Sequence, residues 1–223
     1  VQVPAALHLC KLGYTYLDNI CAYDTKTNIL IDVFLNAVKR FNPGLSGSEA
    51  SLLYAKIVNI ANNDDLGREF YQLLSANSGM KLIDFENPEN NDWHVTTEFT
   101  CENEDTEDEF RPDITCFVNG LPLAFIEVKK PNNREGILAE RERINKRMSK
   151  SCFRRFFNIT QLMIFSNNQE YDTDSRVPIQ GAFYCCAAKE KAFFNVFREE
   201  DKRYVSDYPC LLYTSDAADD GES

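Results

Sequence analysis

The sequence predicts a protein of the α/β (α+β) class, in which a mixed β-sheet flanked by helices follows a helical N-terminal part. Two observations predict this class. Apolar residues recur at helical spacing up to about residue 76, and short apolar runs of strand character alternate with helical segments after that. With 223 residues and 43% hydrophobic content, the chain is long enough to bury one sizeable core. We therefore expect one domain over residues 1–210, with the helical part at about 1–90 and the sheet core at about 91–205.

Three helices are predicted in the N-terminal part. Residues 30–41 carry apolar side chains at helical spacing, and Asn42-Pro43-Gly44 ends this pattern. A second helix follows with Ser48 as its N-cap and stops at the polar residues 62–65. Residues 66–76 have the pattern of a third, shorter helix.

The sheet core is predicted from alternating and continuous apolar runs. Residues 93–99 alternate apolar and polar side chains, which is typical of a strand. Residues 113–129 form a hairpin around the turn signal Asn119-Gly120. We expect a helix at 135–150, strands at 159–165 and 182–188, and a closing helix at 189–198.

The two ends of this hairpin away from its turn carry Asp113, Glu127 and Lys129. Side chains two apart on a strand share a face, so Glu127 and Lys129 point the same way. Magnesium prefers hard oxygen ligands and is usually held by one or two carboxylates, which Asp113 and Glu127 supply, with the carbonyl of Val128 as a third oxygen. Lys129 then stabilises the negative charge that develops during phosphodiester hydrolysis. The pattern therefore predicts a metal-dependent nuclease, although a Glu-Lys pair is also typical of a solvated strand face.

The hairpin register decides whether these groups meet. With a strict two-residue turn at Asn119-Gly120, Asp113 falls opposite Ile126 and points away from Glu127. A three-residue loop with Gly120 in the left-handed conformation shifts the pairing by one residue and places Asp113 opposite Glu127. We therefore predict a bulged loop at the turn, or a bulge near Pro112.

The charge distribution predicts a DNA-binding surface despite a net charge of −11. Residues 129–155 contain ten Lys or Arg against three acids, whereas residues 98–109 contain seven acids and no base. Phosphate binding requires a local basic patch and not a basic total. Arg143 and Arg147 share one face of the predicted helix, which is equally well explained as a solvated face. The expected DNA contacts are Lys130, Arg143, Lys146, Arg147 and Lys150.

Composition also indicates the compartment. The eight cysteines lack the Cys-x-x-Cys spacing of a zinc site, and several lie in apolar runs, which favours buried reduced thiols in a cytoplasmic protein. No apolar run of 18 residues and no signal segment is present, so we expect no membrane association. Residues 211–223 are small, acidic and aperiodic, and we expect them to be a non-native tail.

The hairpin sequence resembles a known family. The run from Arg111-Pro112-Asp113 through Asn119-Gly120-Leu121-Pro122-Leu123 to Ile126-Glu127-Val128-Lys129-Lys130-Pro131 is similar to the N-terminal endonuclease domain of type I restriction enzyme R subunits, which belongs to the PD-(D/E)XK nuclease group. Leu12-Gly13-Tyr14, Phe41-Asn42-Pro43 and residues 157–167 are similar too. The resemblance covers roughly residues 5–205 and implies a restriction-endonuclease-like fold.

This resemblance implies a magnesium-dependent endonuclease that acts on double-stranded DNA, with Asp113 and Glu127 as metal ligands and Lys129 as the catalytic lysine. It also implies modification and specificity subunits as partners, and an ATP-driven motor in the full-length protein. No Gly-x-x-x-x-Gly-Lys-Ser/Thr motif occurs here, so we expect the ATP site to lie outside this chain. Many members carry Gln-x-x-x-Tyr on the helix after the catalytic strand, where this chain has Arg143-Ile144-Asn145-Lys146-Arg147.

Two other interpretations stay open at this point. One is a non-catalytic module with a nuclease-like fold that docks DNA or partner subunits through the basic segment 134–155. The other is a nuclease of the same group that works outside a type I complex, for instance in DNA repair. Cleavage of DNA that depends on Glu127 and Lys129 distinguishes the nuclease interpretations from the docking module.

Overall fold

The computed structural model of the protein describes residues 2–18, 20, 22–76, 79–101, 109–171, 176, 179–187 and 190–196. Its centre is one mixed sheet, whose strands lie side by side in the order of the sequence. The pairs β1–β2 and β4–β5 are parallel, and the other neighbouring pairs are antiparallel. The strands are β1 (Thr15–Tyr16), β2 (Trp93–Thr97), β3 (Ile114–Val118), β4 (Leu121–Val128), β5 (Leu162–Ser166), β6 (Ala182–Cys185) and β7 (Asn195–Val196).

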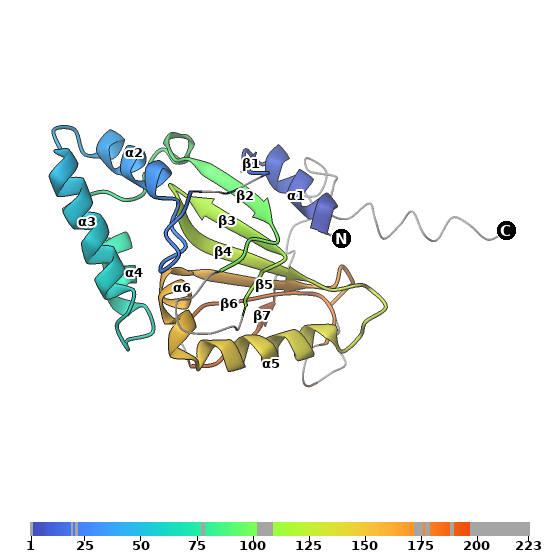
Figure 1. The fold of residues 1–223 in the computed structure, drawn as a ribbon. Coiled ribbons are helices and arrows are strands. Elements are labelled where there is room, and N and C mark those ends of the chain that lie inside the picture. Colours follow the sequence, from blue (N-terminus) through green and yellow to red (C-terminus); the bar gives the residue numbers. More distant parts are fainter. Residues whose placement is uncertain are drawn as a thin grey trace.

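Helices cover the sheet on both faces and at one end (Figure 1). Helix α5 runs along one face, α1 lies on the opposite side near β2, and α2, α3 and α4 gather beyond the turn that joins β3 to β4. None of the helices in the described ranges is long and apolar enough to cross a membrane. The helices are α1 (Gln2–Lys11), α2 (Ile31–Phe41), α3 (Gly47–Ile60), α4 (Arg68–Leu74), α5 (Gly136–Met148) and α6 (Arg154–Ile159), with 3-10 turns η1 (Pro88–Asn90) and η2 (Ser151–Phe153).

Aromatic rings fill the space between the sheet and the α5–α6 segment. Phe110 lies at the centre, with ring centroids 5.6 Å from Phe125, 6.1 Å from Phe153, 5.6 Å from Phe156 and 5.9 Å from Phe157. The contact with Phe157 is stacked and the other three are edge-to-face, and such ring pairs add to the free energy gained by burying the rings. This core fixes α5 over the same sheet face that carries the side chain of Phe125, and therefore also that of Glu127.

The hairpin of β3 and β4 contains a bulge, but at a different place from the predicted one. The turn has two residues, because Val118 pairs directly with Leu121, and both Asn119 (φ 52°) and Gly120 (φ 80°) adopt left-handed conformations. The register then shifts, since Phe117 pairs with Pro122 and the next residue, Cys116, pairs with Ala124. Leu123 is thus an extra residue on β4.

Because of this bulge, the outer half of the hairpin has the register that the site requires. Ile114 pairs with Ile126, so Asp113 follows opposite Glu127. The prediction of a bulged loop at the turn was wrong, as was its alternative near Pro112, but the predicted shift of one residue is confirmed.

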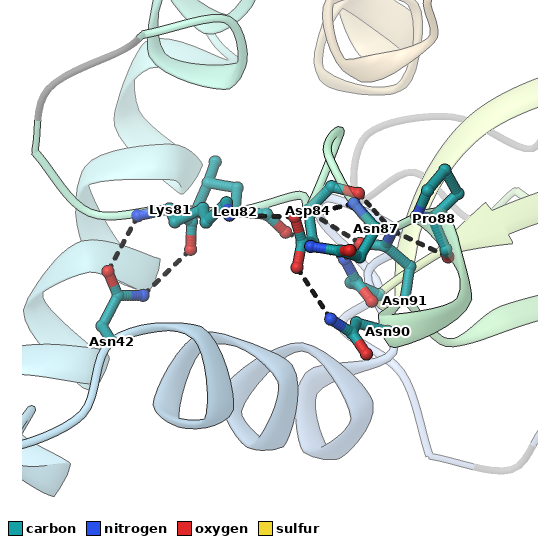
Figure 2. A network of polar contacts seen from close by, with 9 residues as sticks. Asn42, Lys81, Leu82, Asp84, Asn87, Pro88, Asn90 and Asn91 are labelled. Carbon is teal, nitrogen blue, oxygen red and sulfur yellow. Dashed lines mark hydrogen bonds and ion pairs between the residues drawn. The ribbon is translucent and has the colours of Figure 1, made fainter.

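The turn end of the hairpin is held by amide side chains, and Figure 2 shows the adjoining polar network around Asp84 and Asn91. Buried Asn119 donates through Nδ2 to the carbonyl of Leu82 and to Oδ1 of Asn91, both at 2.9 Å, and its own Oδ1 accepts from the backbone of Asp92 at 2.8 Å. Asn91 in turn donates to the carbonyl of Asp84 at 2.8 Å. The carbonyl of Gly120 accepts a hydrogen bond from Leu30 at the start of α2, which ties the helical layer to the turn.

The other predicted elements agree with the structure in most places. The helices at 30–41, 66–76 and 135–150 and the strands at 93–99, 159–165 and 182–188 are confirmed in type, with shorter bounds. The N-cap of α3 is Ser46 and not Ser48, because Ser46 and Glu49 form a reciprocal capping box. Helix α6 was not predicted. The predicted helix at 189–198 is wrong for the described residues 190–196, which end in strand β7, and residues 211–223 lie outside the described ranges.

Candidate active site

Asp113 is held at the open end of the hairpin by two hydrogen bonds. Its Oδ2 accepts from the backbone N–H of Val128 at 2.8 Å, directly across the pair of strands. Its Oδ1 accepts from the side-chain amide of Gln2, which comes from the first turn of α1. These contacts fix the carboxylate beside the end of β4 and leave its side chain 22% exposed.

Glu127 lies deeper, with only 4% of the residue exposed. Its pKa is raised to about 8, mainly by burial in the sheet face beneath α5 and also by the negative charge of Glu140, while Lys129 opposes both effects. Without another cation, this carboxyl therefore retains its proton near neutral pH. Binding of a cation in place of this proton is therefore favourable.

Lys129 joins three carboxylates. Its Nζ lies 2.9 Å from Glu140 Oε2, 3.3 Å from Glu127 Oε2 and 3.8 Å from Asp113 Oδ2. Burial by itself lowers the pKa of this ammonium, but the hydrogen bond that it donates to Glu140 and the charges of the three carboxylates raise the pKa above its ordinary value. Lys129 is therefore a fixed positive charge at the end of strand β4. The structure thus brings Asp113, Glu127 and Lys129 together, while their catalytic roles stay predictions.

Glu140 is a member of this cluster that the sequence reasoning missed. It lies in α5 with its side chain only 2% exposed, between the buried residues Ile137 and Ile144. A signal was available, because Glu140 stands three residues after Ile137 and four before Ile144, which is the spacing of one helix face. On this helix, only basic residues were predicted to have a functional role.

The predicted DNA contacts divide into two groups. Arg143 and Arg147 turn toward Glu140: Arg143 donates through Nε to Oε1 at 3.2 Å and through Nη2 to Oε2, and Arg147 Nη1 lies 3.8 Å from Oε1. Arg147 also packs over the ring of Phe110, 4.6 Å from its centroid. Lys130, Lys146 and Lys150 are exposed. The two arginines therefore share one helix face, as predicted, and border the carboxylates.

The oxygen donors fit a divalent cation in their chemistry. Asp113 and Glu127 lie opposite one another at the open end of the hairpin, and both supply carboxylate oxygens. The raised pKa of the buried Glu127 carboxyl indicates that added positive charge is favourable here. Within the described ranges, however, no three His, Cys, Asp or Glu side chains are arranged as a ready metal site. Lys129 lies among the carboxylates instead. Binding of a cation between these carboxylates would require the ammonium of Lys129 to move.

Comparison with known proteins identifies a matching family and a relative. The family described as "Type I restriction enzyme R protein N terminus" matches residues 1–173. A protein of Methanocaldococcus jannaschii, named as the endonuclease subunit of type I restriction enzyme MjaIXP, is 31% identical over an alignment that covers 60% of this chain. That alignment spans 15% of the relative, so this chain corresponds to a small part of a much longer protein.

Proposed function

Because the chain belongs to the family of type I restriction enzyme R protein N termini, we propose that it is a magnesium-dependent DNA endonuclease domain that hydrolyses phosphodiester bonds. One observation carries this proposal: the bulge at Leu123 brings Asp113, Glu127 and Lys129 together at the open end of the β3–β4 hairpin. A buried carboxyl with a raised pKa and a fixed ammonium at the same point are typical of a catalytic site and expensive as a purely structural device.

Each residue then has a definite task. Asp113, Glu127 and the carbonyl of Val128 hold Mg²⁺, which when bound supplies Lewis-acid activation and neutralises charge on the phosphate. Lys129 stabilises the negative charge on the scissile phosphate oxygens, as a fixed point charge that requires no reorganisation. The basic residues Lys130, Arg143, Lys146, Arg147 and Lys150 contact the DNA backbone and set its position.

The proposal also concerns the full-length protein. We propose double-stranded DNA as the substrate and the modification and specificity subunits of a type I complex as partners. The ATP-driven motor of the full-length protein lies outside these 223 residues, since the sequence contains no phosphate-cradling Gly-x-x-x-x-Gly-Lys-Ser/Thr motif.

Metal binding tests the site directly. Titration with Mn²⁺ in the wild type, followed by calorimetry, is expected to show one binding event that disappears in Asp113→Asn and in Glu127→Gln. Glu142→Gln on α5 is the matched control, because this carboxylate is exposed and bonded only to Arg141 among the described residues. Retention of Mn²⁺ binding in Glu127→Gln would contradict the proposed ligands.

Cleavage tests the chemistry. With Mg²⁺ and duplex DNA, Lys129→Ala is expected to reduce the rate by about 10²- to 10³-fold, as removal of a charge-stabilising donor does. Lys56→Ala, an exposed lysine on α3, is expected to cut like the wild type. If no variant and no wild-type form cuts, while DNA binding stays salt-sensitive and survives Lys129→Ala, the chain is a docking module with a nuclease-like fold.

A further inference from the structure

Among the described residues, Glu140 contacts more cationic side chains than either of the other two carboxylates of the cluster, Asp113 and Glu127. Lys129 contacts its Oε2 at 2.9 Å, Arg143 contacts both of its oxygens, and Arg147 lies 3.8 Å from Oε1. The carboxylate itself is 2% exposed. A buried carboxylate in such a position is retained only as part of a paired set, because removal of one partner leaves an uncompensated charge.

Glu140 is also the nearest carboxylate to the catalytic lysine. Its distance to Nζ of 2.9 Å is shorter than the 3.3 Å of Glu127 and the 3.8 Å of Asp113. Those two residues are the proposed cation ligands. The group that fixes the lysine therefore comes from helix α5 and is independent of the hairpin.

We propose that Glu140 is a positioning residue, which holds Lys129 in place for the reaction and links it to Arg143 and Arg147 on the same helix. This inference rests on the proposed function. Arg143 is the solvent-side member of the set, with 60% of its side chain exposed, whereas Lys129 is the inner member at 19%. DNA that contacts helix α5 would therefore influence the position of Lys129 through the carboxylate of Glu140.

The test compares Glu140→Gln with Glu142→Gln. The glutamine keeps the size of the side chain and an oxygen that can accept from Lys129, but it removes the charge. Glu142 lies on the same helix with a 61% exposed side chain. The first measurement is the rate at which an amine-reactive reagent modifies Lys129, followed by peptide mass spectrometry without DNA or metal. We expect a several-fold faster modification in Glu140→Gln and no change in Glu142→Gln.

The second measurement is DNA cleavage with Mg²⁺, in the protein as its gene encodes it. Glu140→Gln is expected to lower the rate by about 10²-fold, the effect of a small misplacement of a catalytic group, and to leave metal binding by Asp113 and Glu127 in place. If Glu140→Gln does not fold, Arg143→Gln weakens the same set from the solvent side. It is expected to raise the modification of Lys129 by a smaller factor.

Three outcomes decide the question. Equal modification of Lys129 in Glu140→Gln and Glu142→Gln overturns the positioning role, and so does faster modification with unchanged cleavage. A wild-type protein that does not cut DNA overturns the proposed nuclease function. In that case the modification rates still show whether Glu140 holds Lys129.

Discussion

The two ends of the β3–β4 hairpin bury polar groups in opposite ways. At the turn, the Asn119 amide donates to Asn91 Oδ1, and Asn91 donates to the carbonyl of Asp84. The carboxylate of Asp84 accepts from the Asn90 amide and the Lys81 ammonium, which hold its pKa well below the usual range (Figure 2). At the open end, burial raises the pKa of Glu127 to about 8. One end stabilises its buried carboxylate as an anion, and the other does not.

This difference separates structural from functional polarity. Amide side chains that are paired on every side rigidify the turn, and the backbone hydrogen bond from Leu30 to the carbonyl of Gly120 joins it to helix α2. Carboxylates gathered around one ammonium cost stability, and such a cost is typical of sites arranged for chemistry. Substitutions at the turn should therefore affect folding, whereas substitutions at the open end should affect activity and its pH dependence.

The largest effect is expected for Asn119→Asp. The new carboxylate would place an acceptor against the carbonyl of Leu82 and Oδ1 of Asn91, where the wild type has a donor. We expect a loss of about 4 kcal/mol in the free energy of unfolding, measured by urea denaturation. Asn59→Asp, the same change at an exposed position of α3, should alter stability by less than about 0.5 kcal/mol. Similar values for both variants would show that the amide network is not structural.

Gly120→Ala should be the next largest. An added Cβ would lie 2.5 Å from the carbonyl oxygen of Leu30, and the residue has a φ of +80°. We expect a loss of about 3 kcal/mol, from strain and from the displaced start of α2. Gly44→Ala has the same kind of backbone conformation (φ +91°) with nothing within 4 Å of the new Cβ, so it isolates the backbone term and should cost less. Equal losses would remove the contact with Leu30 from the explanation.

At the open end, Glu127→Gln should stabilise the metal-free protein above neutral pH. The carboxyl releases its proton near pH 4.5 when unfolded and near pH 8 when folded. Between these values the folded state binds more protons, so the stability of the wild type falls as the pH rises. Glu127→Gln removes this slope and should be more stable by on the order of 2 kcal/mol at pH 8.

Thermal denaturation in EDTA between pH 5 and pH 8.5 measures this effect, with Glu142→Gln as the exposed control. Addition of Mg²⁺ should restore stability to the wild type at pH 8 and leave Glu127→Gln unchanged. The same pH slope in the wild type and in Glu127→Gln would show that Glu127 is not the titrating group.

The smallest effect is expected on the outer face of α5. Lys146 is exposed and contributes to the proposed DNA-binding surface. Lys146→Gln should weaken DNA binding only a few-fold and reduce the slope of log affinity against log salt by about 1, without a change in stability. Fluorescence anisotropy over a salt series measures this slope. Lys56→Gln on α3 should leave it unchanged, and an equal reduction in both variants would place the DNA elsewhere.

The sequence predicted the elements with local signals and missed the features that depend on contacts far along the chain. Asn119-Gly120 marked the turn because both residues tolerate left-handed conformations. The bulge at Leu123 had only a weak local signal, the preceding Pro122, because proline inside a sheet is typical of an edge strand or a bulge. The segment at 189–198 has helical spacing, yet Phe194 stacks on Phe183 and the chain pairs with β6 instead. Tertiary contacts overrode local propensity there.

The candidate site shows the same division. Asp113, Glu127 and Lys129 were identified from residue type and strand period, and the structure places them together. Glu140 lies between Ile137 and Ile144 on the buried face of α5, and the prediction for this helix did not include it. Its partner, Lys129, is eleven positions away, so only the packing of α5 on the sheet reveals the pair.

The extra residue at Leu123 has a consequence for counting. Across a two-residue turn without a bulge, directly opposite residues are separated by an odd number of positions, as Val118 and Leu121 are. Asp113 and Glu127 are separated by an even number, 14 (127 minus 113), and still share a face. An even separation of two facing residues over an Asn-Gly turn thus requires an odd number of bulges between them. The parity of the spacing alone can therefore reveal a bulge between two facing residues.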